Sequence, residues 1–379
     1  MPATQSHPCL SPAQLAADLS IRDLSDPADG PHAMQQLVAD ATAALAACWG
    51  LDPGAQVRYC RGPRVVPVAD NYDRLGYAAD DVTRQARYTR YVDDQMVLRS
   101  HSTAMIPPAL RELARDAAAT EMLLVCPGIA YRRDAIDWQH TGTPHQLDLW
   151  RLSRRPLAPA DLDEMVAVLA GTWLPGMPVR TEQRVHPYTI GGRQVDVAAD
   201  RGWVEIGECG LAHPVILAAA GLDGWSGLAL GAGLDRLLML RKGVRDIRLL
   251  RSAEPRVRSQ MLDLEPYRQV SSQPAMRRDL SVAVAAGEDA ETIGDRVRLA
   301  LGPDADAVED VRVLASTEYA DLPPAAAGRI GMLPGQRNLL VRVVLRHLDR
   351  SLTGTEANEL RDRIYAAIHQ GSRPQWASR

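Results

Sequence analysis

Residues 131–148 read Tyr-Arg-Arg-Asp-Ala-Ile-Asp-Trp-Gln-His-Thr-Gly-Thr-Pro-His-Gln-Leu-Asp. Because alternate side chains of a strand share a face, we predict one strand that presents Arg132 and Asp134 together. A turn rich in Gly and Thr follows, and a second strand would present Gln146 and Asp148 together. A guanidinium can clamp phosphate oxygens, and an amide beside a carboxylate can hold an ammonium group. The segment therefore favours a hairpin that binds a nucleotide beside an amino acid, although Arg-Arg-Asp alone is more often a solvated ion pair.

A second informative segment lies downstream, where residues 226–236 read Ser-Gly-Leu-Ala-Leu-Gly-Ala-Gly-Leu-Asp-Arg. We predict an apolar strand that runs into Gly231 and Gly233, followed by a helix from about Leu234. Glycines without a Cβ let a backbone approach a flat ligand closely, and Arg236 in the first helical turn could reach a phosphate or stack on a purine. Tight packing of the strand on the helix explains the same glycines, and the spacing matches neither a dinucleotide fingerprint nor a Walker loop.

Length and composition restrict the class of protein. The chain has 379 residues and a formal net charge of −4, so we expect two domains and no global field that attracts nucleic acid. The five cysteines show no Cys-x-x-Cys spacing, which argues against a structural zinc site and fits a reducing compartment. No apolar run reaches the length of a membrane span, and the N-terminus has no apolar signal core. These features predict a cytoplasmic protein without a membrane partner.

Patterns along the chain predict four regions in an α+β protein. Residues 1–55 should form an N-terminal helical segment. Residues 56–251 alternate strand-like and helical runs, which is typical of a mixed domain around an antiparallel sheet. A linker containing Pro and Ser follows at residues 252–273. Residues 274–379 then restart with strand, helix and strand in the order of a split βαβ, ferredoxin-like unit.

Local signals place several helices within these regions. Ser11 followed by proline predicts a capped helix start, and apolar residues at helical spacing predict a second helix over residues 32–49. A third helix, over residues 159–174, should cross between the two informative segments. Near the C-terminus, Thr353 and Glu356 have the spacing of a capping box.

Taken in chain order, the two segments resemble motifs two and three of class II aminoacyl-tRNA synthetases, and specifically the catalytic core of phenylalanyl-tRNA synthetase. Tyr-Arg-Arg-Asp-x-Ile-Asp-x-x-His followed by His-Gln-Leu-Asp is similar to the single-chain, mitochondrial-type form of that enzyme. Further matches lie at residues 70–73, 98–104 and 203–214. The resemblance covers roughly residue 65 to the C-terminus. It implies a class II synthetase antiparallel-sheet catalytic core followed by a ferredoxin-fold anticodon-binding-like domain.

The resemblance also implies a reaction. The chain would be an aminoacyl-tRNA ligase that uses ATP and Mg²⁺ to activate an aromatic amino acid, with phenylalanine as the first expectation, and transfers it to tRNA. The amino acid carboxylate attacks the α-phosphate and pyrophosphate leaves, so positioning and charge stabilisation dominate. The C-terminal region shows no basic stripe, so tRNA as a partner depends on the resemblance alone. We expect a monomer or homodimer.

Roles for individual residues follow from the same resemblance. Arg132 and Arg236 would be catalytic, Arg132 at the α-phosphate and carboxylate and Arg236 at the γ-phosphate. Glu205 would bind Mg²⁺, which usually takes one or two carboxylates together with phosphate oxygens. Without the resemblance, Glu205 could equally pair with a neighbouring arginine, and His101 could be a satisfied histidine beneath the sheet. The ATP-binding residues would be Arg132, Asp134, His140, Pro144 and Arg236, and the amino-acid-binding residues His101, Thr103, Gln146, Asp148, His186, Tyr188 and Ala229.

Several positions depart from the family's pattern, and the chain contains no phenylalanine at all. Pro144 stands where the family stacks a phenylalanine on adenine. His186 and Tyr188 replace the two rings of a Phe-Pro-Phe run. Ile106 replaces a glutamine, and Glu208 replaces a glycine. Polar groups near a pocket demand a polar partner in the ligand, so these changes indicate an altered amino-acid pocket.

Three hypotheses remain open. The first is a phenylalanine-charging enzyme, which a chain free of phenylalanine would suit when that amino acid is scarce. The second is a paralogue that activates a different amino acid or loads an acceptor other than tRNA. The third is a non-catalytic synthetase-like regulator, and it is disfavoured because one chain retains the full set of Arg132, Asp134, Gln146, Asp148 and Arg236.

Overall fold

The computed structural model describes residues 8–200, 202–270, 274–348 and 350–373. The start of the predicted N-terminal segment and the end of the predicted linker therefore lie outside the described residues. The chain forms two compact units. The first comprises Met1–Arg132, Thr143–Val244 and Met261–Pro266, and the second Arg133–Gly142, Arg245–Gln260 and Tyr267–Arg379. The predicted domain boundaries stay a prediction, and the two units differ from them chiefly in the placement of residues 133–142.

A seven-stranded sheet forms the centre of the first unit. Each pair of neighbouring strands is antiparallel except β1 and β4, which are parallel. This arrangement confirms the predicted α+β fold built on an antiparallel sheet. The strands follow one another in space in the order β1 (Val57–Tyr59), β4 (Glu121–Ile129), β5 (His145–Ser153), β9 (Ser226–Gly233), β8 (Gly202–Ala212), β7 (Thr189–Ala199) and β6 (Val179–Gln183).

The helices of the first unit begin where capping residues allow them to begin. Ser11 and His32 accept hydrogen bonds from the first turns of the first two helices, and Pro159 occupies the first position of another. The predicted helices over residues 32–49 and 159–174 are confirmed. The bounds are α1 (Pro12–Ser20), α2 (Ala33–Trp49), α3 (Val68–Asn71), α4 (Ile106–Leu113), α5 (Pro159–Trp173), α6 (Pro214–Ala219) and α7 (Leu234–Lys242), with a 3₁₀ turn at Ser102–Met105 and a small sheet of β2 (Val65–Pro67) and β3 (Met96–Leu98).

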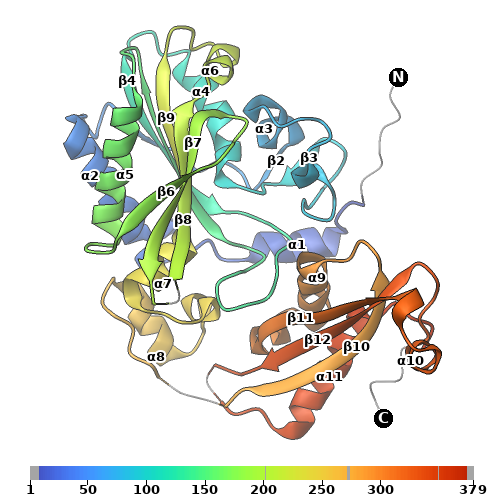
Figure 1. Cartoon of the computed structure of the whole chain (residues 1–379). Coiled ribbons are helices and arrows are strands. Elements are labelled where there is room, and N and C mark those ends of the chain that lie inside the picture. Colours follow the sequence, from blue (N-terminus) through green and yellow to red (C-terminus); the bar gives the residue numbers. More distant parts are fainter. Residues whose placement is uncertain (1–7, 201, 271–273, 349, 374–379) are drawn as a thin grey trace, which may run out of the picture. The chain divides into compact units, whose positions relative to one another are not determined.

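Helices cover both faces of the seven-stranded sheet (Figure 1). On one face, α2 and α5 pack together, and the indole Nε1 of Trp173 donates to the carbonyl of Leu37 at 3.0 Å. On the other face, α4 and α6 cover an apolar cluster that includes Leu124, Trp150 and Ala229. Successive residues of a strand point to opposite faces. Every second residue of β5 and β9, counted from Trp150 and Ala229, therefore points to the face of α4.

The second unit contains a three-stranded sheet in the order β10 (Met276–Ala285), β12 (Gln336–Leu345) and β11 (Val308–Glu318). Both outer strands are antiparallel to β12 and hence parallel to each other. Helix α9 (Ala290–Leu301) connects them, which is the split βαβ order that the sequence predicts. The other helices are α8 (Pro255–Arg258), α10 (Pro324–Ile330) and α11 (Gly354–Ile368). The predicted capping box of Thr353 and Glu356 begins α11.

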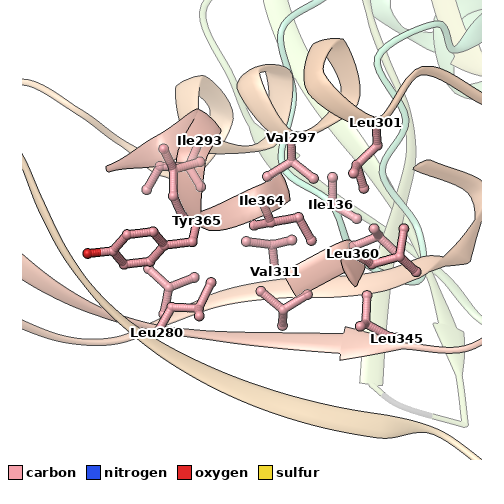
Figure 2. Packing of buried hydrophobic residues seen from close by; sticks show 14 of the residues in the cluster. Ile136, Leu280, Ile293, Val297, Leu301, Val311, Leu345, Leu360, Ile364 and Tyr365 are labelled. Carbon is pink, nitrogen blue, oxygen red and sulfur yellow. The ribbon is translucent and has the colours of Figure 1, made fainter. Parts of the chain in front are cut away.

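One face of this smaller sheet is covered by α9 and α11 over an apolar core (Figure 2). Apolar residues of α11 lie in this core, with Ile364 fully buried. Ile136, from the segment Arg133–Gly142, packs into the same core and is 6% exposed. That segment belongs to the second unit for this reason.

The hairpin predicted over residues 131–148 is only half present. Its second strand is confirmed as β5. Its first strand ends at Ile129, and residues 130–136 form no strand. The prediction that Arg132 and Asp134 share one face of a strand is therefore wrong.

The backbone after β4 finds partners other than a neighbouring strand. Tyr131 N donates to Arg99 O at 2.9 Å, and the Ala135 carbonyl accepts a hydrogen bond from Arg298 Nη2 at 2.6 Å. Since these groups are already satisfied, no hairpin ladder is needed to satisfy them.

Within the described ranges, no helix has the length and apolar character required to cross a membrane.

Candidate active site

Five strands of the larger sheet place one row of residues side by side. In the order of the strands, the row consists of Cys126, Asp148, Gly231, Glu208 and Gln194. Directly opposed residues of antiparallel strands point to the same face. Gly231 adds no side chain between Asp148 and Glu208, whose main chains are two strand spacings, about 9.6 Å, apart. We call these five residues the Asp148–Glu208 row. One carboxylate lies on each side of the central glycine.

The same face continues on both sides of the row. Along β5 it presents Gln146, Asp148 and Trp150, which are two residues apart. Along β9 it presents only residues without atoms beyond Cβ, namely Gly233, Gly231 and Ala229. The sheet thus has a flat floor between the polar side chains of β5 and β8, and it brings the predicted residues Gln146, Asp148 and Ala229 together.

A β-bulge decides where Glu205 points. In β8, Glu205 pairs with Asp196 of β7, and Ile206 is then an extra residue without a partner in the ladder. Glu205 and Glu208 are three residues apart and would point to opposite faces of a regular strand. The bulge turns both toward the face of the Asp148–Glu208 row. Burial raises the pKa of Glu205, Arg236 opposes this effect, and the charge of Glu208 adds to it.

Asp148 is 3% exposed and is held by hydroxyl groups. The Ser102 hydroxyl donates to its carboxylate, and the Ser102 amide donates to Gln146 Oε1 at 3.0 Å. Burial raises the pKa of Asp148 to about 6, although Ser102, Thr103 and the Arg132 guanidinium favour the ionised form. The predicted residue Thr103 therefore lies beside Asp148.

A backbone hydrogen bond holds the guanidinium of Arg132 in place. Its Nε donates to the Ser100 carbonyl at 2.7 Å. Asn71 holds Ser100 in turn, since its Oδ1 accepts from Ser100 N at 3.1 Å and its Nδ2 donates to Ser100 Oγ at 2.8 Å. The Arg132 charge influences the pKa of both Asp148 and Glu208. Among the described residues the guanidinium forms no ion pair, so its terminal nitrogens remain able to bind an anion near the row.

His101 is a neutral ring. Burial, together with the nearby Arg132 charge, lowers its pKa to about 3. It stacks on Tyr77 with ring centroids 5.9 Å apart. Both ring nitrogens are shielded from solvent and make no hydrogen bond of good geometry, although the Asn71 backbone lies near enough to favour protonation slightly. The contact of this ring with an amino acid stays a prediction.

Basic side chains lie at the other end of the row. His186 Nε2 lies 2.8 Å from Glu208 Oε2, and Arg184 Nε lies 3.5 Å from Glu208 Oε1. Burial by itself raises the pKa of Glu208, but His186, Arg184 and Arg132 together lower it below its usual value. Glu208 is therefore ionised at neutral pH.

Tyr188 connects the two ends of the row. Its ring stacks on His186 at a centroid distance of 5.8 Å and on Trp150 at 6.1 Å, and it lies 6.4 Å from the ring of Tyr77. Both Asp148 and Glu208 raise the pKa of its hydroxyl, after the larger effect of burial. The predicted residues His186 and Tyr188 are thus part of the same cluster as Asp148.

Arg236 lies in the first turn of α7, directly after the floor of β9. Its Nη1 donates to the Glu205 carbonyl at 2.6 Å and lies 3.9 Å from Glu205 Oε1. The preceding residue, Asp235, accepts from the amide of His145 and contacts its Nδ1 at 3.2 Å. This contact fixes the start of α7 against β5. The alternative that Glu205 pairs with an arginine is therefore realised, and its role in binding Mg²⁺ stays a prediction.

The remaining predicted residues are Pro144, Asp134 and His140. Pro144 immediately precedes β5, and its carbonyl accepts from Ala130 N at 2.8 Å. Asp134 and His140 belong to the second unit, where His140 Nδ1 lies 2.6 Å from Asp137 Oδ2. The contacts of these three residues with a nucleotide stay predictions.

Sequence reasoning missed several members of the cluster. Trp150 follows Asp148 by two residues, so the period of a strand could have found it. Ser102 lies inside a segment that resembles the family, next to His101 and Thr103. Tyr77 has no such signal, because only the folded chain brings it to His101.

Comparison with known proteins identifies relatives of the chain. Residues 54–261 match the family model described as tRNA synthetases class II core domain (F). The phenylalanine--tRNA ligase alpha subunit of Prochlorococcus marinus is 32% identical over 54% of this chain and 59% of its own length. The chloroplastic/mitochondrial phenylalanine--tRNA ligase of Arabidopsis thaliana is 27% identical over 79% of this chain and 68% of its own length.

A third relative is the probable mitochondrial phenylalanine--tRNA ligase of Drosophila melanogaster, which is 27% identical over 80% of this chain and 75% of its own length. The chain spans about 60% of the length of the bacterial alpha subunits that it matches.

Proposed function

The chain belongs to the family of class II tRNA synthetase core domains, and on this basis we propose that it activates an α-amino acid with ATP and transfers the aminoacyl group to tRNA. Phenylalanine is the first candidate substrate, since the curated relatives are named phenylalanine--tRNA ligases. We propose the single-chain, mitochondrial-type form of that enzyme, located in the cytoplasm as a monomer or homodimer. A non-catalytic regulator remains the alternative that an activity assay would reveal.

One observation carries the proposal most directly: a guanidinium held rigidly beside the Asp148–Glu208 row. Arg132 is fixed at Nε by Ser100, and its charge reaches both carboxylates of the row. Adenylation brings the carboxylate of an amino acid to the α-phosphate of ATP. A fixed cation between two anions lowers the cost of that approach. Asp148 and Gln146 supply acceptors for the ammonium group of the same amino acid.

Arg236 and Glu205 would act at the other end of the triphosphate. Arg236 would bind the terminal phosphate, and Glu205 would hold Mg²⁺ with oxygens of ATP. In the part of the chain that the structure describes, no group of three or more His, Cys, Asp or Glu is placed to hold a metal ion. A single carboxylate such as Glu205 would suffice in the proposal, because Mg²⁺ keeps several waters and binds through one or two carboxylates plus substrate phosphates.

Transfer to tRNA is the second half of the proposal. The ferredoxin-like second unit supports it by its resemblance to an anticodon-binding domain. Its surface charge gives no independent support, so the acceptor has to be tested directly.

The Glu208 carboxylate, which lies 2.8 Å from the His186 ring, favours a second candidate, namely a paralogue that activates an amino acid other than phenylalanine. An ionised carboxylate beside the substrate favours a ligand with a polar side chain, because a purely apolar ligand displaces water from the carboxylate without replacing the lost hydrogen bond.

Exchange of labelled pyrophosphate into ATP tests the activation step. We expect exchange with at least one member of a panel that contains the proteinogenic amino acids and hydroxylated or amino-substituted aromatic ones. Transfer of that amino acid to total tRNA then tests the acceptor. Exchange with no amino acid, by a folded protein that still binds tRNA, would support the regulator and contradict the proposal.

A further inference from the structure

We propose that Glu208 determines specificity by accepting a hydrogen bond from an amino or hydroxyl group on the side-chain ring of the activated amino acid. The inference rests on the proposed function and deepens it, because it names the substrate class. It concerns Glu208, a residue to which the resemblance assigns no role.

The position of Glu208 is the first step. Glu208 lies opposite Gly231, and Gly231 lies opposite Asp148. A Cβ on Gly231 would come no nearer than 3.7 Å to the Asp148 carboxylate, so this floor is flat rather than tightly packed. An amino acid whose ammonium group binds Asp148 can lie along the floor with its side chain directed toward Glu208.

The remaining hydrogen-bonding capacity of Glu208 is the second step. His186 contacts Oε2 at 2.8 Å, whereas Arg184 Nε lies 3.5 Å from Oε1. The second distance is longer than that of a good N–H···O hydrogen bond. A carboxylate offers about four acceptor positions. Oε1 therefore retains the capacity to accept a donor from a ligand, and the His186 ring lies against Oε2.

The aromatic rings of the cluster indicate which chemical group would carry the donor. Tyr77, Tyr188 and the neutral His101 form a continuous series of ring contacts with centroid distances of 5.9 and 6.4 Å. Flat rings favour edge-to-face or offset contacts with another ring. A ring that bears a hydrogen-bond donor satisfies both the aromatic side chains and the carboxylate.

The expected selectivity follows from the cost of an unsatisfied charge. An unsubstituted or methylated ring displaces water from Glu208 without replacing the hydrogen bond. Sites built to bind a polar group reject the analogue that lacks it by up to about 10⁴–10⁵-fold. Glu208 is half-buried rather than fully enclosed, so we expect a preference of at least about 10²-fold.

Pyrophosphate exchange with matched substrates tests the inference. 4-Amino-L-phenylalanine and 4-methyl-L-phenylalanine have nearly the same size and differ in the donor, and the 3-substituted pair and L-tyrosine extend the comparison to position and to a hydroxyl group. The wild-type protein should prefer an amino- or hydroxyl-substituted ring in kcat/KM. Glu208→Leu should abolish or invert the preference. Glu208→Gln keeps the shape of the side chain, and it should lower the preference at least about tenfold.

Glu112→Gln provides the matched control, since Glu112 lies on the outer surface of α4 with a side chain that is 67% exposed. Thermal unfolding of each variant separates loss of specificity from loss of folding. A wild-type preference for phenylalanine or the methylated rings that Glu208→Gln leaves unchanged overturns this inference and leaves the proposed function intact. Absence of exchange with every amino acid overturns both.

Discussion

The two sheets of the molecule use their covered faces in opposite ways. In the second unit, β12 alternates regularly, and the side chains it turns toward α9 and α11 are apolar, including the fully buried Val341 and Val343. In the first unit, the face beneath α4 carries Asp148, which is 3% exposed. Burying a polar group costs free energy unless partners satisfy it. The smaller sheet is therefore built for stability, whereas the larger one accepts a cost in stability to hold a polar cluster.

The largest expected effect concerns the polar face. Arg132→Ala should lower the rate of pyrophosphate exchange by about 10²–10³-fold, because removal of one fixed electrostatic donor has an effect of this size. Its thermal unfolding should change little, since the guanidinium forms no ion pair within the described part of the chain. Arg155→Ala, at a side chain that is 77% exposed, is the control. A variant that loses stability and keeps its exchange rate would break the comparison between the two sheets.

Substitutions on the apolar face of the smaller sheet should lower the stability of the protein. Ile364→Ala removes a fully buried side chain from the core of the second unit, and such a substitution costs about 2–5 kcal/mol in the free energy of unfolding. Urea denaturation followed by circular dichroism measures this loss. Leu299→Ala changes a side chain that is 57% exposed in the same unit and should cost much less. Equal losses for the two variants would show that the core is not packed as described.

The smallest expected effect is on the pH dependence of stability, and it tests the same contrast between the two sheets. The pKa of Asp148 is raised from 3.8 to about 6 by burial, so the folded protein holds this proton more tightly than the unfolded chain does. The contribution to stability is present below pH 4 and is lost as the pH rises from about 4 to about 6. Asp148→Asn should therefore raise the free energy of unfolding at pH 7 by about 1–3 kcal/mol and flatten its pH dependence over this interval.

Asp163→Asn, at a side chain that is 62% exposed, should leave both the stability and its pH dependence nearly unchanged. If Asp148→Asn instead destabilises the protein at pH 7, then Asp148 makes a net contribution to stability there. The contrast between the two sheets would then be smaller than stated.

Regular elements could be predicted well from the sequence. The helices over residues 32–49 and 159–174 and the restart of strands and helices after residue 274 depend on spacing of apolar residues and on capping residues, which are local properties. The same spacing placed Gln146 and Asp148 on one strand face. It failed for Arg132 and Asp134, because residues 130–136 find hydrogen-bond partners that are remote in the sequence.

The sequence by itself thus determined the family, the α+β fold and most of the residue types in the cluster. The spacing of apolar residues, the helix-capping residues and the order of the motifs are all properties of the local sequence. Only the tertiary structure decided that the bulge at Ile206 turns Glu205 and Glu208 to one face. It also decided that Arg236 pairs with Glu205 and that His186 contacts Glu208. The physical reason is that strand register and ion pairing depend on groups far apart in the chain, whose proximity no local pattern encodes.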